Sequence, residues 1–198
     1  MTETGAMNEE GGRRGRRSGE GTEAGQGGIR LVGRLADEAA TRDLAALLAG
    51  AAEPGTTFLL EGPVGAGKSA FARAFITHLR RHHGQPPEEV PSPTYTIVQT
   101  YRAGPLEIWH ADLYRLCSPD ELVELGLEEA FETAVVLIEW PERLGELRPS
   151  GAVTLRLEPM GENARALALT LPAALAGRLA PRLAAFGLER NGEGTGHA

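Results

Sequence analysis

Residues 62–69 have the composition and spacing of a loop that binds phosphate groups. The segment reads Gly62-Pro-Val-Gly-Ala-Gly-Lys-Ser69 and fits the pattern G-x-x-x-x-G-K-[ST]. Glycines let backbone N–H groups point inward around a phosphate, because no Cβ obstructs them. A lysine supplies a compact positive charge for the β- and γ-phosphates, and a serine hydroxyl is a ligand for Mg²⁺. The segment therefore predicts a site for a nucleoside triphosphate and Mg²⁺.

Lysine is rare in this chain, which makes Lys68 distinctive. Of the 20 lysine and arginine residues among 198, one is a lysine. A lysine retained among so many arginines indicates a position that a planar guanidinium does not suit. The formal net charge of −7 also argues against a protein that grips nucleic acid through its own surface, because neutralising phosphates needs a basic face.

Two acidic residues in predicted strands are candidates for binding Mg²⁺ or positioning water near the phosphates. Val135–Ile138 is a continuous apolar run, typical of a strand covered on both faces, and Glu139 ends it. A carboxylate there either lies in the crevice at the strand's carboxyl end, where it can hold Mg²⁺, or faces solvent. Asp112, in the pattern His110-x-Asp112, could position water or the metal shell. Alternatively it is an ordinary polar residue of an edge strand, or a partner of Arg115.

The segment Ser92-Pro-Thr-Tyr-Thr96 follows the helix expected after the phosphate loop. It is either a switch-like segment whose hydroxyl groups sense Mg²⁺ or the terminal phosphate, or a loop that begins a strand. Histidines at 78, 82 and 83 lie near the end of the same helix. Without cysteines or regularly spaced acids beside them, they indicate a solvated helix terminus rather than a metal site.

The phosphate loop needs a strand before it and a helix after it, and the sequence pattern supplies both. The strand is predicted at 57–60 and the helix at 69–82. Further strands are predicted at 29–33, 94–101, 106–114, 135–138, 153–157 and 166–171, and further helices at 37–48 and 173–186. This order predicts an α/β, three-layer P-loop fold with a mostly parallel central sheet and an antiparallel hairpin inserted around the turn at 102–105.

One folded unit is expected, since a domain has about 150 residues. Residues 1–28 are rich in glycine and polar residues, and a disordered tail is predicted there, with a second flexible tail at 189–198 and the folded domain at 29–188. No apolar run reaches the ~18 residues of a membrane helix, and no secretory signal is evident. A single cysteine excludes a disulfide framework. We therefore expect a cytoplasmic protein without membrane attachment.

Four blocks of the sequence, in order, resemble the TsaE family, the P-loop ATPases of bacterial tRNA threonylcarbamoyladenosine (t6A) synthesis. The resemblance covers about residues 37–165. It rests on Gly-x-x-Gly-Ala-Gly-Lys-Ser at 62–69, Ser-Pro-Thr-Tyr-Thr at 92–96, His-x-Asp-Leu-Tyr-Arg at 110–115 and Leu-Ile-Glu-Trp-Pro at 137–141. The chain departs from the family at Ser69, where threonine is usual, and at Ala111, where an aromatic residue is frequent.

The resemblance implies roles for the matching residues. By this resemblance the catalytic residues are Lys68, Asp112 and Glu139, and Asp112 is the acid needed for hydrolysis. Ser69 and Glu139 would bind Mg²⁺. A larger set of residues would bind the nucleotide: Gly65, Ala66, Gly67, Lys68, Ser69, Ala70, Thr41, Trp140 and Arg165.

The resemblance also implies a function and partners. The chain would bind ATP and Mg²⁺ and would hydrolyse ATP to cycle a complex of TsaD and TsaB. That complex transfers threonylcarbamoyl to adenosine 37 of tRNA. The chain itself would contact tRNA only through the complex. Two alternatives stay open. A small-molecule P-loop kinase would need an acceptor pocket and a lid with arginines, and no arginine-rich lid segment is evident after Glu139. A nucleotide-binding regulator without turnover is disfavoured by the presence of both Asp112 and Glu139.

Overall fold

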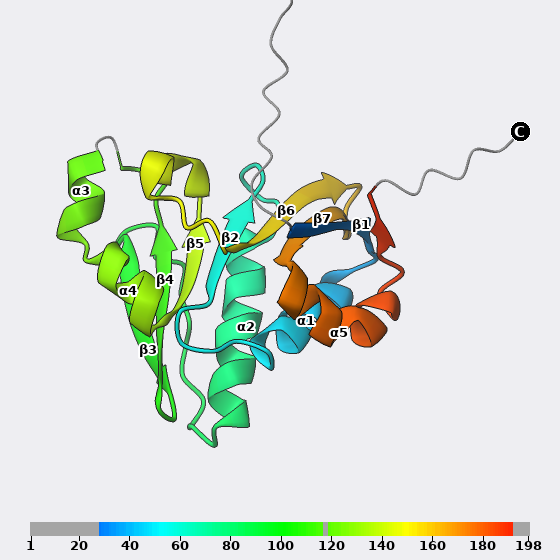
Figure 1. Ribbon diagram of the computed structural model, residues 1–198, viewed down its shortest axis with the longest axis horizontal. Coiled ribbons are helices and arrows are strands. Elements are labelled where there is room, and N and C mark those ends of the chain that lie inside the picture. The colour runs from blue at the N-terminus through cyan, green and yellow to red at the C-terminus, as the bar shows by residue number, and fades with distance from the viewer. Residues whose placement is uncertain (1–27, 117–118, 192–198) are drawn as a thin grey trace, which may run out of the picture.

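The computed structural model describes residues 28–116 and 119–191, built around one eight-stranded sheet (Figure 1). The strands are β1 (Gly28–Leu35), β2 (Thr57–Glu61), β3 (Val98–Ala103), β4 (Leu106–Asp112), β5 (Val135–Glu139), β6 (Val153–Met160), β7 (Ala164–Pro172) and β8 (Glu189–Arg190). The helices are α1 (Glu38–Ala49), α2 (Lys68–His82), α3 (Pro119–Glu124), α4 (Leu127–Thr133), α5 (Ala173–Ala184) and the 3₁₀ helix η1 (Pro141–Leu147). The sheet order is β3-β4-β5-β2-β6-β7-β1-β8.

The sheet is mixed, which corrects the expectation of a mostly parallel one. The pairs β4–β5, β5–β2 and β2–β6 are parallel. The pairs β3–β4, β6–β7, β7–β1 and β1–β8 are antiparallel. Parallel neighbours need a long crossover connection, usually a helix. The links 104–105 and 161–163 are too short for one, so β3–β4 and β6–β7 fold back as hairpins.

Helices cover both faces of the sheet around β5. Val135 and Leu137 belong to the hydrophobic core that includes α1, α2 and α5, whereas Val136 and Ile138 belong to the core that includes α3, α4 and η1. This alternation is the two-residue period of a strand, and it explains why all of β5 is buried. The phosphate loop therefore leaves β2 in the middle of a three-layer stack.

The folded unit is slightly longer than the predicted domain. β1 begins at Gly28, and β8 pairs with β1 inside the segment that was predicted to be a C-terminal tail. Residues 1–27 and 192–198 of the predicted tails lie outside the described residues. Among the residues that the structure describes, no helix is both long and apolar enough to cross a membrane.

Residues 93–96 form a turn and residue 97 a bend, where the beginning of a strand was predicted at 94. β3 begins only at Val98, after Ile97, whose φ is 65°. A β-branched residue rarely adopts this left-handed conformation. The turn places the Ser92 hydroxyl beside Ser69, at the end of the phosphate loop, and the Thr94 hydroxyl against Asp112.

Candidate functional site

The loop between β2 and α2 turns at three glycines with positive φ, Gly62, Gly65 and Gly67. A Cβ at Gly62 would overlap the backbone carbonyl oxygen of Leu157 on β6. Gly67 is the N-cap of α2, and its carbonyl accepts the first helical hydrogen bond. The N–H groups at 67–70 begin the helix and have no partners within it. Loop and helix terminus together present the donors that an anion needs.

We expect Gly62→Ala to destabilise the fold. The new methyl group would overlap the Leu157 carbonyl at a φ of +132°, and backbone strain of this kind costs about 1–3 kcal/mol. That corresponds to a loss of roughly 2–12 °C in melting temperature for a domain of this size. Gly151→Ala is the matched control, because a Cβ at Gly151 meets nothing within 4 Å. Equal thermal melts of the two variants would contradict the packing argument.

Lys68 packs back against the loop that precedes it. Its Nζ donates to the carbonyl oxygens of Gly62 and Pro63 at 2.8 and 2.9 Å and lies 3.9 Å from the ring centroid of Trp140. Burial lowers the pKa of Lys68 from its ordinary value, and the nearby carboxylate of Glu139 opposes this shift. A partly desolvated ammonium attracts a phosphate more strongly than a hydrated one.

Ser69, Glu139 and His110 form a hydrogen-bonded line beside the loop. Ser69 Oγ donates to Glu139 Oε2 at 2.8 Å, and His110 Nε2 lies 2.9 Å from Glu139 Oε1. Glu139 and His110 are buried. Glu139 ends β5, and His110 lies two residues before the end of the neighbouring parallel strand β4, on the sheet face that α2 covers. The predicted metal-ligating carboxylate therefore does not face solvent.

Asp112 is connected to the same loop through two hydroxyl groups. Ser92 Oγ lies 3.4 Å from Ser69 Oγ and 2.9 Å from Thr94 Oγ1, and Thr94 donates to Asp112 Oδ2 at 2.9 Å. The backbone N–H of Tyr114 donates to Asp112 Oδ1 at 3.0 Å. Both carboxylate oxygens of this buried residue are thus fixed, at the carboxyl end of β4.

Trp140 covers the lysine from the end of β5. Its backbone is left-handed, with φ of 61°, so the chain turns sharply after the strand. The indole ring packs on Lys68 and on Tyr114, whose ring centroid lies 4.9 Å away. The two aromatic rings therefore form a wall beside the phosphate loop.

A cavity of about 180 Å³ lies on the other side of the loop. Arg165 donates from Nε to the Ala66 carbonyl at 2.9 Å, and Thr41 is buried in α1 beside it. The cavity is lined by α1, the loop, the start of α2 and the β6–β7 turn: Glu38, Thr41, Ala66, Gly67, Ala70, Glu162, Asn163 and Arg165.

The structure brings the predicted site residues together around one loop. On one side lie Lys68, Ser69, Asp112, Glu139 and Trp140; on the other lie Thr41, Ala66, Gly67, Ala70 and Arg165, with Gly65 in the loop itself. Sequence reasoning gave no role to His110 and left the segment at 92–96 open. The available signal for His110 was its position two residues before Asp112, on the same face of one strand.

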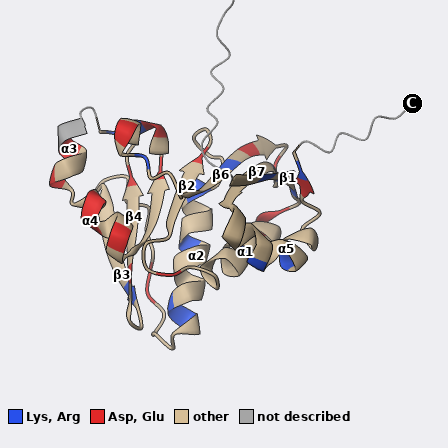
Figure 2. Ribbon diagram, viewed as in Figure 1, with Lys and Arg blue, Asp and Glu red and all other residues tan. Residues whose placement is uncertain are grey.

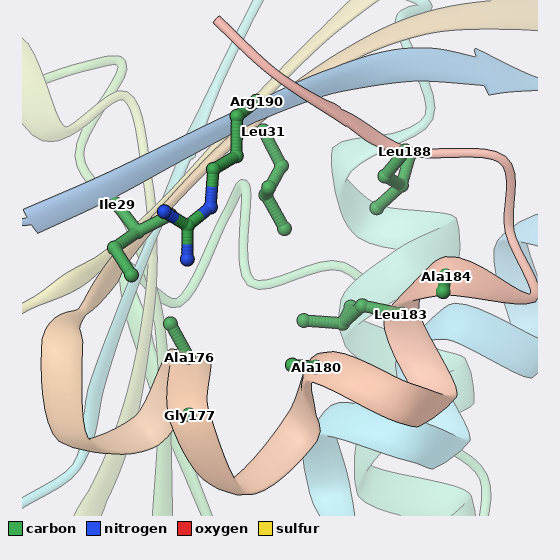
Figure 3. A pocket seen from close by; sticks show the side chains of 9 residues that line it. All are labelled: Ile29, Leu31, Ala176, Gly177, Ala180, Leu183, Ala184, Leu188 and Arg190. Carbon is green, nitrogen blue, oxygen red and sulfur yellow. The ribbon is translucent and has the colours of Figure 1, made fainter.

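A second cavity, of about 190 Å³, lies between α5 and β1 (Figure 3). Figure 3 shows apolar side chains from both elements around it, and Arg190 extending across it. Its lining contains no acid, histidine or hydroxyl group. Arg190 is the one charged side chain of this lining, and the carboxylates found beside the phosphate loop have no counterpart in it.

Comparison with known proteins agrees with this geometry. The family model described as "Threonylcarbamoyl adenosine biosynthesis protein TsaE" matches residues 35–167. The tRNA threonylcarbamoyladenosine biosynthesis protein TsaE of Rickettsia felis is 40% identical over 131 residues, which are 66% of this chain and 74% of that protein. The protein of the same name from Bacillus subtilis is 34% identical over 146 residues, covering 71% and 85% of the two chains.

A solved structure gives the same result. The crystal structure of Bacillus subtilis YdiB matches with a TM-score of 0.63 and 28% identity, over 80% of this chain and 97% of that one. The span matched by the family model contains the phosphate loop, both carboxylates and the flanking cavity. This chain therefore belongs to the TsaE family of threonylcarbamoyl adenosine biosynthesis proteins.

Proposed function

We propose that this protein is a Mg²⁺-dependent ATPase that acts in t6A modification of tRNA at adenosine 37. The observation that carries the proposal is the group of hydroxyls between the two carboxylates: Ser69 donates to Glu139, Thr94 donates to Asp112, and Ser92 Oγ lies between them, 3.4 Å from Ser69 Oγ and 2.9 Å from Thr94 Oγ1. It joins a phosphate loop, a carboxylate suited to Mg²⁺ and a second carboxylate suited to water, which are the parts that phosphoryl transfer to water requires. Membership of the TsaE family supports tRNA modification as the process.

ATP binding would use the loop and the cavity beside it. The N–H groups at 65–70 would surround the β-phosphate, as at other helix N-termini that bind anions. Lys68 would exchange its bonds to two loop carbonyls for bonds to the β- and γ-phosphates. The nucleoside would lie toward the cavity lined by Thr41 and Arg165.

Ser69 and Glu139 fit a Mg²⁺ site. Both present oxygen atoms, which Mg²⁺ prefers, and they lie 2.8 Å apart beside the loop. In the described part of the chain no three His, Cys, Asp or Glu side chains are grouped to hold a metal, so these two residues would share the ion with phosphate oxygens and water. When bound, Mg²⁺ would neutralise charge on the phosphates.

Asp112 would orient the attacking water and accept its proton. The water oxygen forms a bond to the γ-phosphorus, the bond between that phosphorus and ADP breaks, and Lys68 stabilises the charge on the phosphate oxygens. Thr94 and the Tyr114 backbone hold the Asp112 carboxylate in place, so little reorientation is needed during the reaction.

The proposed partners TsaD and TsaB would complete the site in the cytoplasm. Arg165, beside the loop, already donates to the Ala66 carbonyl, and Arg115 donates to the Tyr95 carbonyl. An arginine supplied by another protein contributes ~10³–10⁵-fold in related reactions. Figure 2 shows acidic residues along α4 and η1, which disfavour direct contact with tRNA and support contact through the complex.

We expect the isolated chain to release phosphate slowly and the TsaD–TsaB complex to raise its turnover at least several-fold. Steady-state phosphate release is measured at fixed ATP and Mg²⁺ while the complex is titrated in, with the complex alone as control. A flat titration with the complex demonstrably bound would show that one chain holds the whole site. Radiolabelled ATP distinguishes the kinase alternative, because a kinase places the label on a metabolite rather than on inorganic phosphate.

A further inference from the structure

We propose that His110 is a positioning residue that aims the Glu139 carboxylate at Ser69 and thereby sets the affinity of the site for Mg²⁺. The proposal rests on the Mg²⁺-dependent function proposed above. His110 Nε2 and Glu139 Oε1 are 2.9 Å apart, and the two side chains are only 1% and 3% exposed. The contact joins neighbouring parallel strands, so it is built into the sheet and not into a mobile surface.

His110 occupies a position where the strand pattern favours an apolar residue. Ile108, two residues earlier on β4, belongs to the hydrophobic core under α2, and His110 lies on the same face. Its Nδ1 is buried without a hydrogen-bond partner among the described residues. Leaving a buried polar atom unpaired is unfavourable, so an apolar side chain would fit this position better. The bond to Glu139 supplies a reason for histidine.

An ionised carboxylate only accepts hydrogen bonds, so His110 Nε2 is the donor in the contact with Glu139 Oε1. With Oε1 held by His110, Oε2 faces the Ser69 hydroxyl at 2.8 Å. Without the histidine, the Glu139 carboxylate can turn away from the proposed metal position. Partners that orient metal ligands typically contribute about 10–100-fold in metal affinity.

Two variants of similar length test the hydrogen bond alone. His110→Gln keeps a side-chain N–H that can reach Glu139 Oε1, whereas His110→Met has none. A fluorescent ATP analogue is bound at rising Mg²⁺ concentrations and, separately, in EDTA. We expect the methionine variant to need about 10–100-fold more Mg²⁺ for half-maximal effect. The glutamine variant should stay within a few-fold of the wild type, and all three proteins should bind the nucleotide alike in EDTA.

Each outcome decides the proposal. A methionine variant that titrates like the wild type, or a glutamine variant that loses as much Mg²⁺ affinity as methionine, would reduce His110 to a packing residue. Should His110→Met not fold, His110→Asn replaces it, because the shorter amide cannot reach Glu139 and the same loss is expected. A wild type whose nucleotide binding does not respond to Mg²⁺ would instead overturn the proposed function, and this proposal with it.

Discussion

Lys68→Ala is expected to lower ATP turnover by about 10²–10³-fold, the usual effect of removing one preorganised donor from a charged transition state. Lys68 is the only lysine in the sequence, so no other ammonium group can take its place. Its Nζ already lies at the loop, bonded to the carbonyls of Gly62 and Pro63, and a short movement brings it to a phosphate. Steady-state phosphate release at saturating ATP and Mg²⁺ measures the loss.

Two further variants at this position separate charge from shape. Lys68→Met keeps an apolar stem against Trp140 and removes the charge, so it should lose as much turnover as alanine. Lys68→Arg keeps the charge but replaces a compact ammonium by a wider planar group, and only partial activity is expected. Wild-type turnover in the methionine variant would show that the charge is not used and would refute the assignment of the phosphate loop.

The parts of this protein that follow from local sequence could be predicted, and the phosphate loop is the clearest case. Its glycines, its lysine and the helix after it are contiguous in the chain, so one segment specifies the geometry. β5 was predictable for the same reason, since its apolar run requires cover on both faces. Strand neighbours are different: besides its hairpin partner β7, β6 pairs with β2, from which β3, β4 and β5 separate it in the sequence, and hydrophobic periodicity does not encode such partners.

The contacts that hold the carboxylates of Glu139 and Asp112 could not be predicted from the sequence and are seen only in the structure. Strand alternation places His110 on the face of Asp112, yet its bond to Glu139 depends on the register of β4 against β5. Thr94 was predicted in a strand, where its hydroxyl would follow the alternation. It reaches Asp112 because the chain turns before β3, with Ile97 in a conformation that its residue type disfavours.

Asp112→Asn is expected to lower kcat by about 10²–10⁴-fold, the usual contribution of a general base, while ATP affinity stays within a few-fold of the wild type. The substitution removes a charge and hardly changes shape. The asparagine Oδ1 still accepts the N–H of Tyr114, and Thr94 can accept from the new amide while donating to Ser92, because hydroxyl groups rotate. The contacts of residue 112 with Thr94 and with the Tyr114 backbone are therefore preserved.

The split between binding and turnover is what identifies Asp112 as a group that acts in the chemical step. Asp43→Asn is the matched control, since it makes the same change on the exposed surface of α1 and should leave both quantities unaltered. ATP affinity is measured with a fluorescent analogue and kcat by phosphate release. Normal turnover in Asp112→Asn would show that the carboxylate serves only the architecture of β4. Loss of ATP binding together with turnover would show that Asp112 is needed to form the phosphate-binding site. A general base, by contrast, stabilises the transition state and does not contribute to the affinity for the ground state.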